Sequence, residues 1–310
     1  MMKKTFRIIL LVLIVVTFRT PLSGKAADGR STLPFRPDTL RILAVGNSFS
    51  DDATEYIPSL LESAGIHNVI IGRLYIGGCS LQRHCKEYEA QAHNYMYYKS
   101  GADNRWNVQK NATLLDGVKD EPWDIITMQE QSGYSGIYDN IHTWLPQLME
   151  ILKRECTNPD VRLVWHETWA YAKNAYQHPD FPKYGNDQDR MLEGIRSCVQ
   201  RLQDDFDIET VIPCGEAIQL ARASRLNNVG EVPADTRAYD LTRDGYHLSR
   251  QFGRYLAACT WFEMLVAPTV GVPLSKAHST LRDTEYSLSP KDARLCRRIA
   301  VKACKAQRAK

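Results

Sequence analysis

The stretch RILAVGNSFSDD, residues 41–52, decides the fold class of this chain. Aliphatic side chains dominate its first five positions, Gly46 follows them, and an amphipathic stretch of residues 53–64 comes directly after the two acids. This order is typical of a buried strand, a sharp turn and the start of a helix. We therefore expect an open α/β sheet, in which the turn after this strand faces the crevice where such sheets bind ligands.

Ser48 is the first candidate nucleophile, because it lies in this turn and Gly46 allows the backbone to turn tightly just before it. The alternative is that Ser48, Ser50 and Asp51 only cap the N-terminus of the helix, which is the commonest use of such residues. The choice between these interpretations depends on whether the chain also supplies a base.

Five short apolar segments alternate with helical stretches. They are residues 40–45, 68–75, 123–128, 161–165 and 210–214. The alternation predicts a three-layer α/β/α domain with a five-stranded, flavodoxin-like parallel sheet. Between the second and third strands we expect a helix to about residue 99, then a loop and a short helix. Right-handed crossovers place the ends of the first three strands along one edge, so Ser48, Gly78 and Gln129 converge there.

The composition fits one large domain. The 310 residues are 44% hydrophobic and 24% charged, which is enough for a full core. We assign this domain to residues 40–275. The basic residues 276–310 form a C-terminal extension, with a peripheral helix near residues 290–303 and a frayed tail. The net charge of +3, from 39 basic and 36 acidic residues, provides no field that favours nucleic acid.

The N-terminus is typical of a secretory signal peptide. Basic residues at positions 3, 4 and 7 precede an apolar run at 8–16 and small residues near Ala27. We expect a signal peptide at residues 1–27 and a linker at 28–39. The apolar run is short for a membrane span, although an uncleaved anchor is the alternative. The expected location is therefore secreted or periplasmic, with no membrane span after cleavage.

Eight cysteines fall in a compartment that permits disulfides. Four of them lie among apolar residues and are expected to be buried thiols: Cys156, Cys198, Cys214 and Cys259. The best candidate for a bridge is Cys79 with Cys85.

A base for Ser48 is available in DGYH, residues 244–247, just before the last apolar helix. With a glycine in the turn, the Asp244 carboxylate reaches Nδ1 of His247 and leaves Nε2 facing the serine. The alternative is an Asp-Gly turn followed by a histidine at a helix start. Together with Ser48, the motif favours a catalytic triad.

Such a triad also needs hydrogen-bond donors for a developing oxyanion. The backbone amide of Ser48 is one candidate. The amide of Gly78 is a second, because Gly77-Gly78 lets the main chain approach closely. The third is the side-chain amide of Gln129, directly after the third strand, with Gln131 as the fallback.

These motifs resemble those of the SGNH, or GDSL-like, hydrolases. GNSFS is similar to the GDSx motif that carries the nucleophile in that superfamily, and DGYH is similar to its DxxH. More narrowly, the chain resembles an uncharacterised branch of secreted bacterial proteins, common in gut Bacteroidetes and catalogued as a domain of unknown function. That branch shows GNSFS, a GGCSL-like turn, WDxxTxQ, TWAY and DGxHLS. The match spans about residues 40–266.

The resemblance implies an SGNH hydrolase fold, with Ser48 as nucleophile, His247 as base, Asp244 as its orienting partner and Gly78 as oxyanion donor. Two departures stand out. Asn47 replaces the usual aspartate, and the GxND motif is absent. Its asparagine is replaced by Gln129, as in the QGES segment of the sialate O-acetylesterase-like branch.

The segment after the fourth strand is a candidate binding element. His166, Trp169 and Tyr171 lie in a long polar and aromatic stretch, and their rings suit stacking on a sugar; the alternative is packing within the protein. His166 and Glu167 with His84 or His93 lack metal-ligand spacing. We expect no metal and no cofactor.

By resemblance and by the secretion signal, we expect a secreted serine esterase that removes O-acetyl groups from a poly- or oligosaccharide through an acyl-enzyme. The expected partner is thus a small-molecule or polysaccharide ester. A lipase or thioesterase of the same fold is one alternative, against which the polar loop at residues 166–188 argues. The other is a non-catalytic glycan-binding protein, against which the retained Ser, His and Asp argue.

Overall fold

A computed structural model describes residues 38–206, 208–227, 240–282 and 284–310. The expected signal peptide and nearly all of the expected linker lie outside these residues. Among the residues that are described, no helix combines the length and the apolar character needed to cross a membrane.

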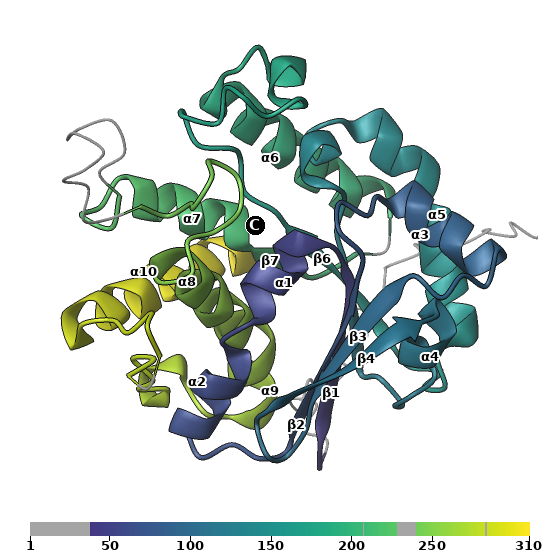
Figure 1. The fold of residues 1–310 in the computed structure, drawn as a ribbon, viewed down its shortest axis with the longest axis horizontal. Helices are drawn as coiled ribbons and strands as arrows, with labels where there is room; N and C mark the ends of the chain where they lie inside the picture. Colours follow the sequence, from purple (N-terminus) through teal and green to yellow (C-terminus); the bar gives the residue numbers. More distant parts are fainter. Residues whose placement is uncertain (1–37, 207, 228–239, 283) are drawn as a thin grey trace, which may run out of the picture. The chain divides into compact units, whose positions relative to one another are not determined.

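A seven-stranded sheet forms the centre of the fold (Figure 1), in the order β4-β3-β2-β1-β5-β6-β7. Its parallel strands are β1 Leu40–Gly46, β2 Val69–Tyr75, β5 Ile125–Met128, β6 Arg162–Glu167 and β7 Val211–Pro213. These are the five expected strands. Gly46 pairs with Tyr75 and Val45 with Met128, so the carboxyl ends of β1, β2 and β5 lie side by side as expected.

The expectation of only five strands is wrong. Two more, β3 Tyr95–Ser100 and β4 Trp106–Ala112, add an antiparallel hairpin beside β2. The expected helix to residue 99 ends much earlier, as α3 Leu81–Glu89. The backbone leaves the helical region at Gln91, where φ is 48°. The tyrosine-rich YMYYKS segment then forms a strand, because aromatic side chains suit a pleated, half-buried surface.

Helices cover both faces of the sheet (Figure 1). The elements not yet given are α1 Ser48–Thr54, α2 Ile57–Ser63, α4 Leu114–Val118, α5 Tyr138–Glu155, α6 Gln188–Asp205, α7 Cys214–Arg222, α8 Phe252–Trp261, α9 Ala267–Val270 and α10 Pro290–Arg308, with short 3-10 or π turns at Ser132–Tyr134, Phe181–Tyr184, Phe262–Val266 and Leu274–Lys276. Along β1, Ile42 and Ala44 join the core under α1, α2, α7, α8 and α10. Leu43 and Val45 join the core under α3, α4 and α5. Burial on both faces explains why β1 is almost continuously apolar.

The C-terminal helix is part of the core, which corrects the expectation of a peripheral helix with a frayed tail. α10 continues to Arg308, and Cys296, Ala300 and Cys304 on it are fully buried. It packs against α7 and α8. Its basic residues occupy the opposite face, which is why the segment is weakly apolar in sequence.

All eight cysteines are buried and unpaired. The expected bridge between Cys79 and Cys85 is therefore wrong, whereas the four buried thiols expected among apolar residues are confirmed. The thiol of Cys79 contacts the Ser80 carbonyl at 3.8 Å, and that of Cys85 contacts the Trp144 carbonyl at 3.9 Å. Each thiol thus contacts a different backbone carbonyl inside the core, and the two thiols do not pair.

Candidate active site

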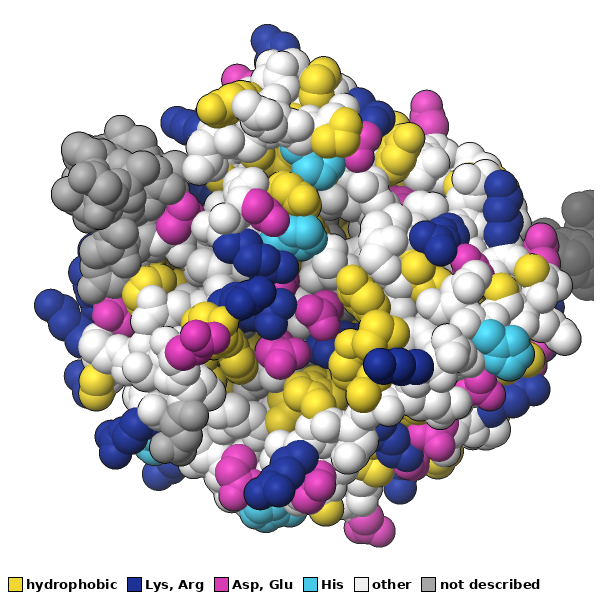
Figure 2. Space-filling model, in the orientation of Figure 1, with side chains coloured by type: hydrophobic (Ala, Val, Ile, Leu, Met, Phe, Trp, Pro, Cys, Tyr) yellow, Lys and Arg dark blue, Asp and Glu magenta, His cyan; other side chains and the backbone are white. Residues whose placement is uncertain are grey.

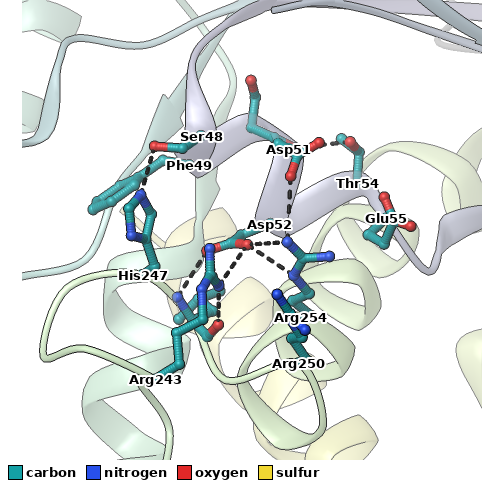
Figure 3. A network of polar contacts seen from close by, with 12 residues as sticks. Ser48, Phe49, Asp51, Asp52, Thr54, Glu55, Arg243, His247, Arg250 and Arg254 are labelled. Carbon is teal, nitrogen blue, oxygen red and sulfur yellow. Dashed lines mark hydrogen bonds and ion pairs between the residues drawn. The ribbon is translucent and has the colours of Figure 1, made fainter. Parts of the chain in front are cut away.

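In the turn after β1, the residue that caps α1 is not the candidate nucleophile. Asn47 is the N-cap of α1, and its Oδ1 accepts a hydrogen bond from the Phe49 amide at 3.0 Å. Ser50 turns its hydroxyl back to the Asn47 carbonyl at 2.8 Å. Because Asn47 and Ser50 complete the turn, the Ser48 hydroxyl is free to face the segment that carries His247 (Figure 3).

Ser48, His247 and Asp244 form a continuous hydrogen-bonded chain. Nε2 of His247 lies 2.9 Å from Oγ of Ser48, and Nδ1 lies 2.7 Å from Oδ2 of Asp244. A carboxylate at Nδ1 favours the tautomer that carries its proton there, which leaves Nε2 to accept the serine proton. The sequence therefore identified three residues that the fold brings together across 199 positions of chain.

The Asp244 carboxylate is well suited to this place. Burial opposes its ionisation, but hydrogen bonds from the His247 ring and from the backbone amides of His247 and Tyr246 outweigh burial and lower the pKa of the carboxyl. Oδ1 accepts those two amides at 2.7 and 3.1 Å. The group stays charged and fixed beside the imidazole.

The backbone amides of Ser48 and Gly78 stay the predicted donors to an oxyanion. Gly78 is exposed, has a φ of 61°, and lies in a turn closed by a 3.2 Å bond from the Cys79 amide to the Ile76 carbonyl. Nδ2 of Asn47 donates to the Cys79 carbonyl at 2.9 Å and ties this turn to the start of α1. Within the described residues, neither the Ser48 amide nor the Gly78 amide donates a hydrogen bond.

Gln129 lies beside this turn but is already engaged. Its Nε2 donates to Oδ1 of Asn47 at 2.8 Å, and its Oε1 lies 2.6 Å from Nδ1 of His166. A Cβ at Gly46 would stand 3.1 Å from Cδ of Gln129, so glycine allows this approach. The second Nε2 hydrogen has no acceptor among the described residues, and the oxyanion role of Gln129 stays a prediction. The fallback, Gln131, instead donates to Asp180 at 3.2 Å.

The expectation that His166, Trp169 and Tyr171 bind substrate is corrected, because all three are completely buried. Burial lowers the pKa of His166 to about 3, so its ring is neutral, and its Nδ1 is hydrogen-bonded to Oε1 of Gln129. The Trp169 ring stacks on Phe49 at 4.2 Å, beneath the triad. The hydroxyl of Tyr171 lies 2.8 Å from Ser132. His166 lies within β6, and Trp169 and Tyr171 follow its end in a segment whose residues 168–172 are all buried.

The half-buried aromatic residues beside the triad are Tyr246 and His178. The ring of Tyr246 lies 4.2 Å from that of His247, and the ring of His178 lies 4.4 Å from that of Tyr246. The segment that carries His178 is joined to the triad segment, by which we mean residues 243–248, through a 2.7 Å bond from the Ala172 amide to the Gly245 carbonyl. This pair, rather than the residues chosen from sequence, provides the half-buried aromatic rings next to His247.

Sequence reasoning also missed Asp52, which is completely buried one helical turn after Ser48 and bonded to the triad segment (Figure 3). The sequence feature that could have revealed it is the second acid after GNSFS, together with Arg243 just before DGYH and Arg254 in the helix that follows. Elsewhere in the described chain, no group of three or more His, Cys, Asp or Glu side chains is arranged to hold a metal ion.

The fold and this site define an α/β protein that carries a serine–histidine–aspartate triad at the carboxyl edge of its parallel strands. The chain belongs to the family described as Domain of unknown function (DUF4886), whose model matches residues 41–298. The resemblance to that branch is thereby confirmed.

The chain is similar to several solved structures. The crystal structure of a DUF4886 family protein from Bacteroides uniformis is 36% identical, with 86% of this chain and 95% of that chain covered and a TM-score of 0.72. An acetyl xylan esterase is 13% identical, covering 73% of this chain and 100% of that chain, with a TM-score of 0.48. A putative GDSL-like lipase from Parabacteroides merdae is 15% identical, covering 77% and 99%, with a TM-score of 0.45. No curated protein matches the chain.

Proposed function

We propose that the protein is a serine esterase. The observation that carries the proposal is the bonded chain from Ser48 Oγ through both ring nitrogens of His247 to Asp244, at 2.9 and 2.7 Å. Nucleophile, base and orienting carboxylate are all within hydrogen-bond reach, which is the arrangement that activates a serine hydroxyl. A helix cap or a plain Asp-Gly turn requires no such alignment.

The mechanism follows from this geometry. Ser48 Oγ attacks the acyl carbon while Nε2 of His247 takes its proton, and the Ser48 and Gly78 amides donate to the developing oxyanion. His247 then protonates the departing alcohol, which leaves an acyl group on Ser48. A water molecule, deprotonated by His247, attacks this acyl-enzyme and releases the acid and the free serine.

The substrate we propose is an O-acetylated poly- or oligosaccharide. Tyr246 and His178 beside His247 provide ring faces with polar edges, which suit a sugar. Around them, Gln131, Asp180 and Lys183 provide polar groups. We further propose that the protein acts after secretion, on the basis of its N-terminal sequence.

The lipase or thioesterase alternative calls for a broad apolar strip beside the nucleophile. Among the described residues, the large exposed apolar side chains are Val108, Tyr134, Tyr176 and Val301. The two valines lie on β4 and α10, away from the triad segment, and the other two are tyrosines. This distribution favours a polar substrate.

The test is hydrolysis of 4-nitrophenyl acetate and butyrate and of acetylated polysaccharides by the wild type, Ser48→Ala and His247→Ala. We expect both substitutions to lower acetate turnover by about 10³-fold or more. Ser63→Ala, a serine of α2 outside the site, is the matched control and keeps wild-type turnover. A wild type no faster than Ser48→Ala on every one of these esters would refute the esterase and favour a glycan-binding protein.

A further inference from the structure

Asp52 receives an unusual number of donors for a completely buried carboxylate. Nη1 of Arg243 lies 3.0 and 3.1 Å from its two oxygens. Nε of Arg254 donates to Oδ1 at 2.8 Å, and the Leu248 amide donates to Oδ2 at 2.8 Å. Buried charges are retained in proteins only where partners of this kind compensate them. Figure 3 shows both guanidinium groups directed at this one carboxylate.

The donors bracket the two triad members that lie outside α1. Arg243 immediately precedes Asp244, and Leu248 immediately follows His247. Nη1 of Arg243 also donates to the Leu248 carbonyl, and the Arg243 amide donates to the His247 carbonyl at 3.0 Å. Asp52 therefore holds both ends of the triad segment, residues 243–248.

Asp52 shares a rigid element with the nucleophile. Ser48 and Asp52 are four residues apart in α1, so they lie on the same face of the helix, one turn from each other. One helix thus presents Ser48 to the ring of His247 and Asp52 to the backbone on which that ring is mounted. A shift of the triad segment along α1 is opposed at both places.

We propose that Asp52 is a positioning residue that sets the distance between Ser48 and the general base. It contacts neither substrate nor reacting atoms, and it acts through the triad segment. The inference rests on the proposed function, because it takes Ser48 as the nucleophile.

The neighbouring Asp51 separates this role from general packing. Asp51 pairs with Arg73 at 2.8 Å and with Arg254 at 3.3 Å, so it helps to dock α1 on β2 and α8. None of its contacts within the described residues reaches the triad segment. Both acids pair with Arg254, but only Asp52 contacts the triad segment, and Asp51→Asn is therefore the control for Asp52→Asn.

The face around the triad is mixed in charge, which bears on the design of the test. In Figure 2, Lys and Arg side chains lie beside a histidine near the middle of the face, with acidic side chains among them. A small neutral probe is therefore preferable to a charged substrate, whose binding would itself respond to the removal of a carboxylate.

The experiment measures the rate at which an uncharged alkyl fluorophosphonate labels Ser48. Ser48 Oγ attacks phosphorus, fluoride leaves, and His247 takes the serine proton, so the rate reports the alignment of the pair without knowledge of the natural ester. We expect Asp52→Asn to lower the second-order rate constant by about 10-fold or more and Asp51→Asn to change it by less than about 2-fold, since misplacement of reacting groups alone can cost far more than this.

Two further measurements distinguish positioning from misfolding. The final extent of labelling counts folded, competent molecules, and it should reach the wild-type value in Asp52→Asn even though the rate is lower. Arg243→Met leaves the bonds from Arg254 and from the Leu248 amide to Asp52 in place and removes only the attachment at the Arg243 end of the triad segment, so it should lower the rate in the same direction as Asp52→Asn.

The outcomes are distinguishable. Wild-type labelling rates in both Asp52→Asn and Arg243→Met would overturn the positioning role while leaving the esterase intact. A lower final extent at an unchanged rate would show a purely structural role and would also overturn it. A wild type that is not labelled at Ser48 would refute the proposed function, and the inference with it.

Discussion

At the scale of single residues, the turn after β1 divides its tasks among neighbours. Oδ1 of Asn47 accepts hydrogen bonds from the Phe49 backbone amide and from the Gln129 side chain. Its Nδ2 donates to the Cys79 carbonyl, so both the oxygen and the nitrogen of the side-chain amide are bonded. An aspartate, the usual residue of the resembled motif, lacks the hydrogen that reaches Cys79. The Asn47 amide therefore joins Gln129 to the turn that holds Gly78.

The contribution of Gln129 is open to direct measurement. We expect Gln129→Leu, which keeps the volume and removes the donor, to lower kcat by about 10²-fold or more with little change in KM, as loss of an oxyanion donor does. The assay is steady-state hydrolysis of 4-nitrophenyl acetate.

His166→Phe is the control for this substitution. It keeps the Gln129 amide and removes only the partner at 2.6 Å from its Oε1, so we expect a smaller loss of kcat. If kcat is unchanged in Gln129→Leu, Gln129 is not an oxyanion donor and its role is limited to the hydrogen bond with Asn47.

The residue scale also shows which functional residues a sequence reveals. Ser48, Asp244 and His247 were predictable, because attack by a serine needs a base and the base needs a carboxylate within three or four residues or across the sheet. The aromatic residues were not. Trp169 and Tyr246 look alike in sequence, yet one is completely buried and the other half-buried, and this difference depends on packing among distant segments.

At the scale of elements, the junction of β6 and α7 contains a buried carboxyl that lies close to a second acid. Glu167 at the end of β6 accepts the Glu216 amide in the first turn of α7 at 2.8 Å. Burial and the nearby charge of Glu216 raise its pKa to about 8. Gly215 permits this approach, since a Cβ there would stand 2.6 Å from Oε1 of Glu167.

This junction predicts a pH-dependent stability. The pKa of Glu167 is about 8 in the folded state, against an ordinary value of 4.5, so the folded state binds the proton more tightly. The contribution of Glu167 to the free energy of unfolding is therefore largest below pH 4.5 and falls as the pH rises toward 8, by an amount on the order of 5 kcal/mol.

We expect Glu167→Gln to remove this fall, because a neutral amide keeps the acceptor for the Glu216 amide and does not titrate. The measurement is urea unfolding of both proteins at pH 5 and pH 8, where the variant gains stability over the wild type at the higher pH only. Parallel pH profiles for the two proteins would contradict the assignment. Glu193→Gln on α6, a glutamate for which no such bond exists among the described residues, is the control.

The elements themselves were predictable to different degrees. The five parallel strands are buried on both faces and therefore appear in the sequence as apolar runs. β4 carries its side chains mostly in solvent and leaves no such run. β3 follows a helix without a proline or glycine between them, so composition gives no boundary, and only the turn at Gln91 marks it.

At the scale of the whole molecule, the C-terminal helix completes the core on one face of the sheet. α10 packs on α7 and α8, and α8 carries the arginine that reaches Asp52. From sequence this segment was interpreted as a peripheral basic tail, because charge on one face of the helix hides the apolar stripe on the other. The extension and the triad segment therefore belong to one cooperative unit.

We expect deletion of residues 290–310 to abolish folding, because it exposes the apolar surface of α7 and α8 that the apolar face of α10, with Ile299, Ala300 and Ala303, covers. The measurement is the recovery of monodisperse protein and its thermal unfolding. Removal of the last two residues, Ala309 and Lys310, is the control and should leave the melting temperature within about 2 °C. A stable, active protein without α10 would contradict this view.

Seven of the eight buried thiols make each side of the sheet individually observable. Cys214, Cys259 and Cys296 lie in the core on one side of the sheet, and Cys79, Cys85, Cys156 and Cys198 lie in the core on the other. An alkylating reagent reaches a thiol only when the surrounding structure opens. The order in which these cysteines are alkylated would therefore tell which side of the molecule loosens first, with no label introduced into the chain.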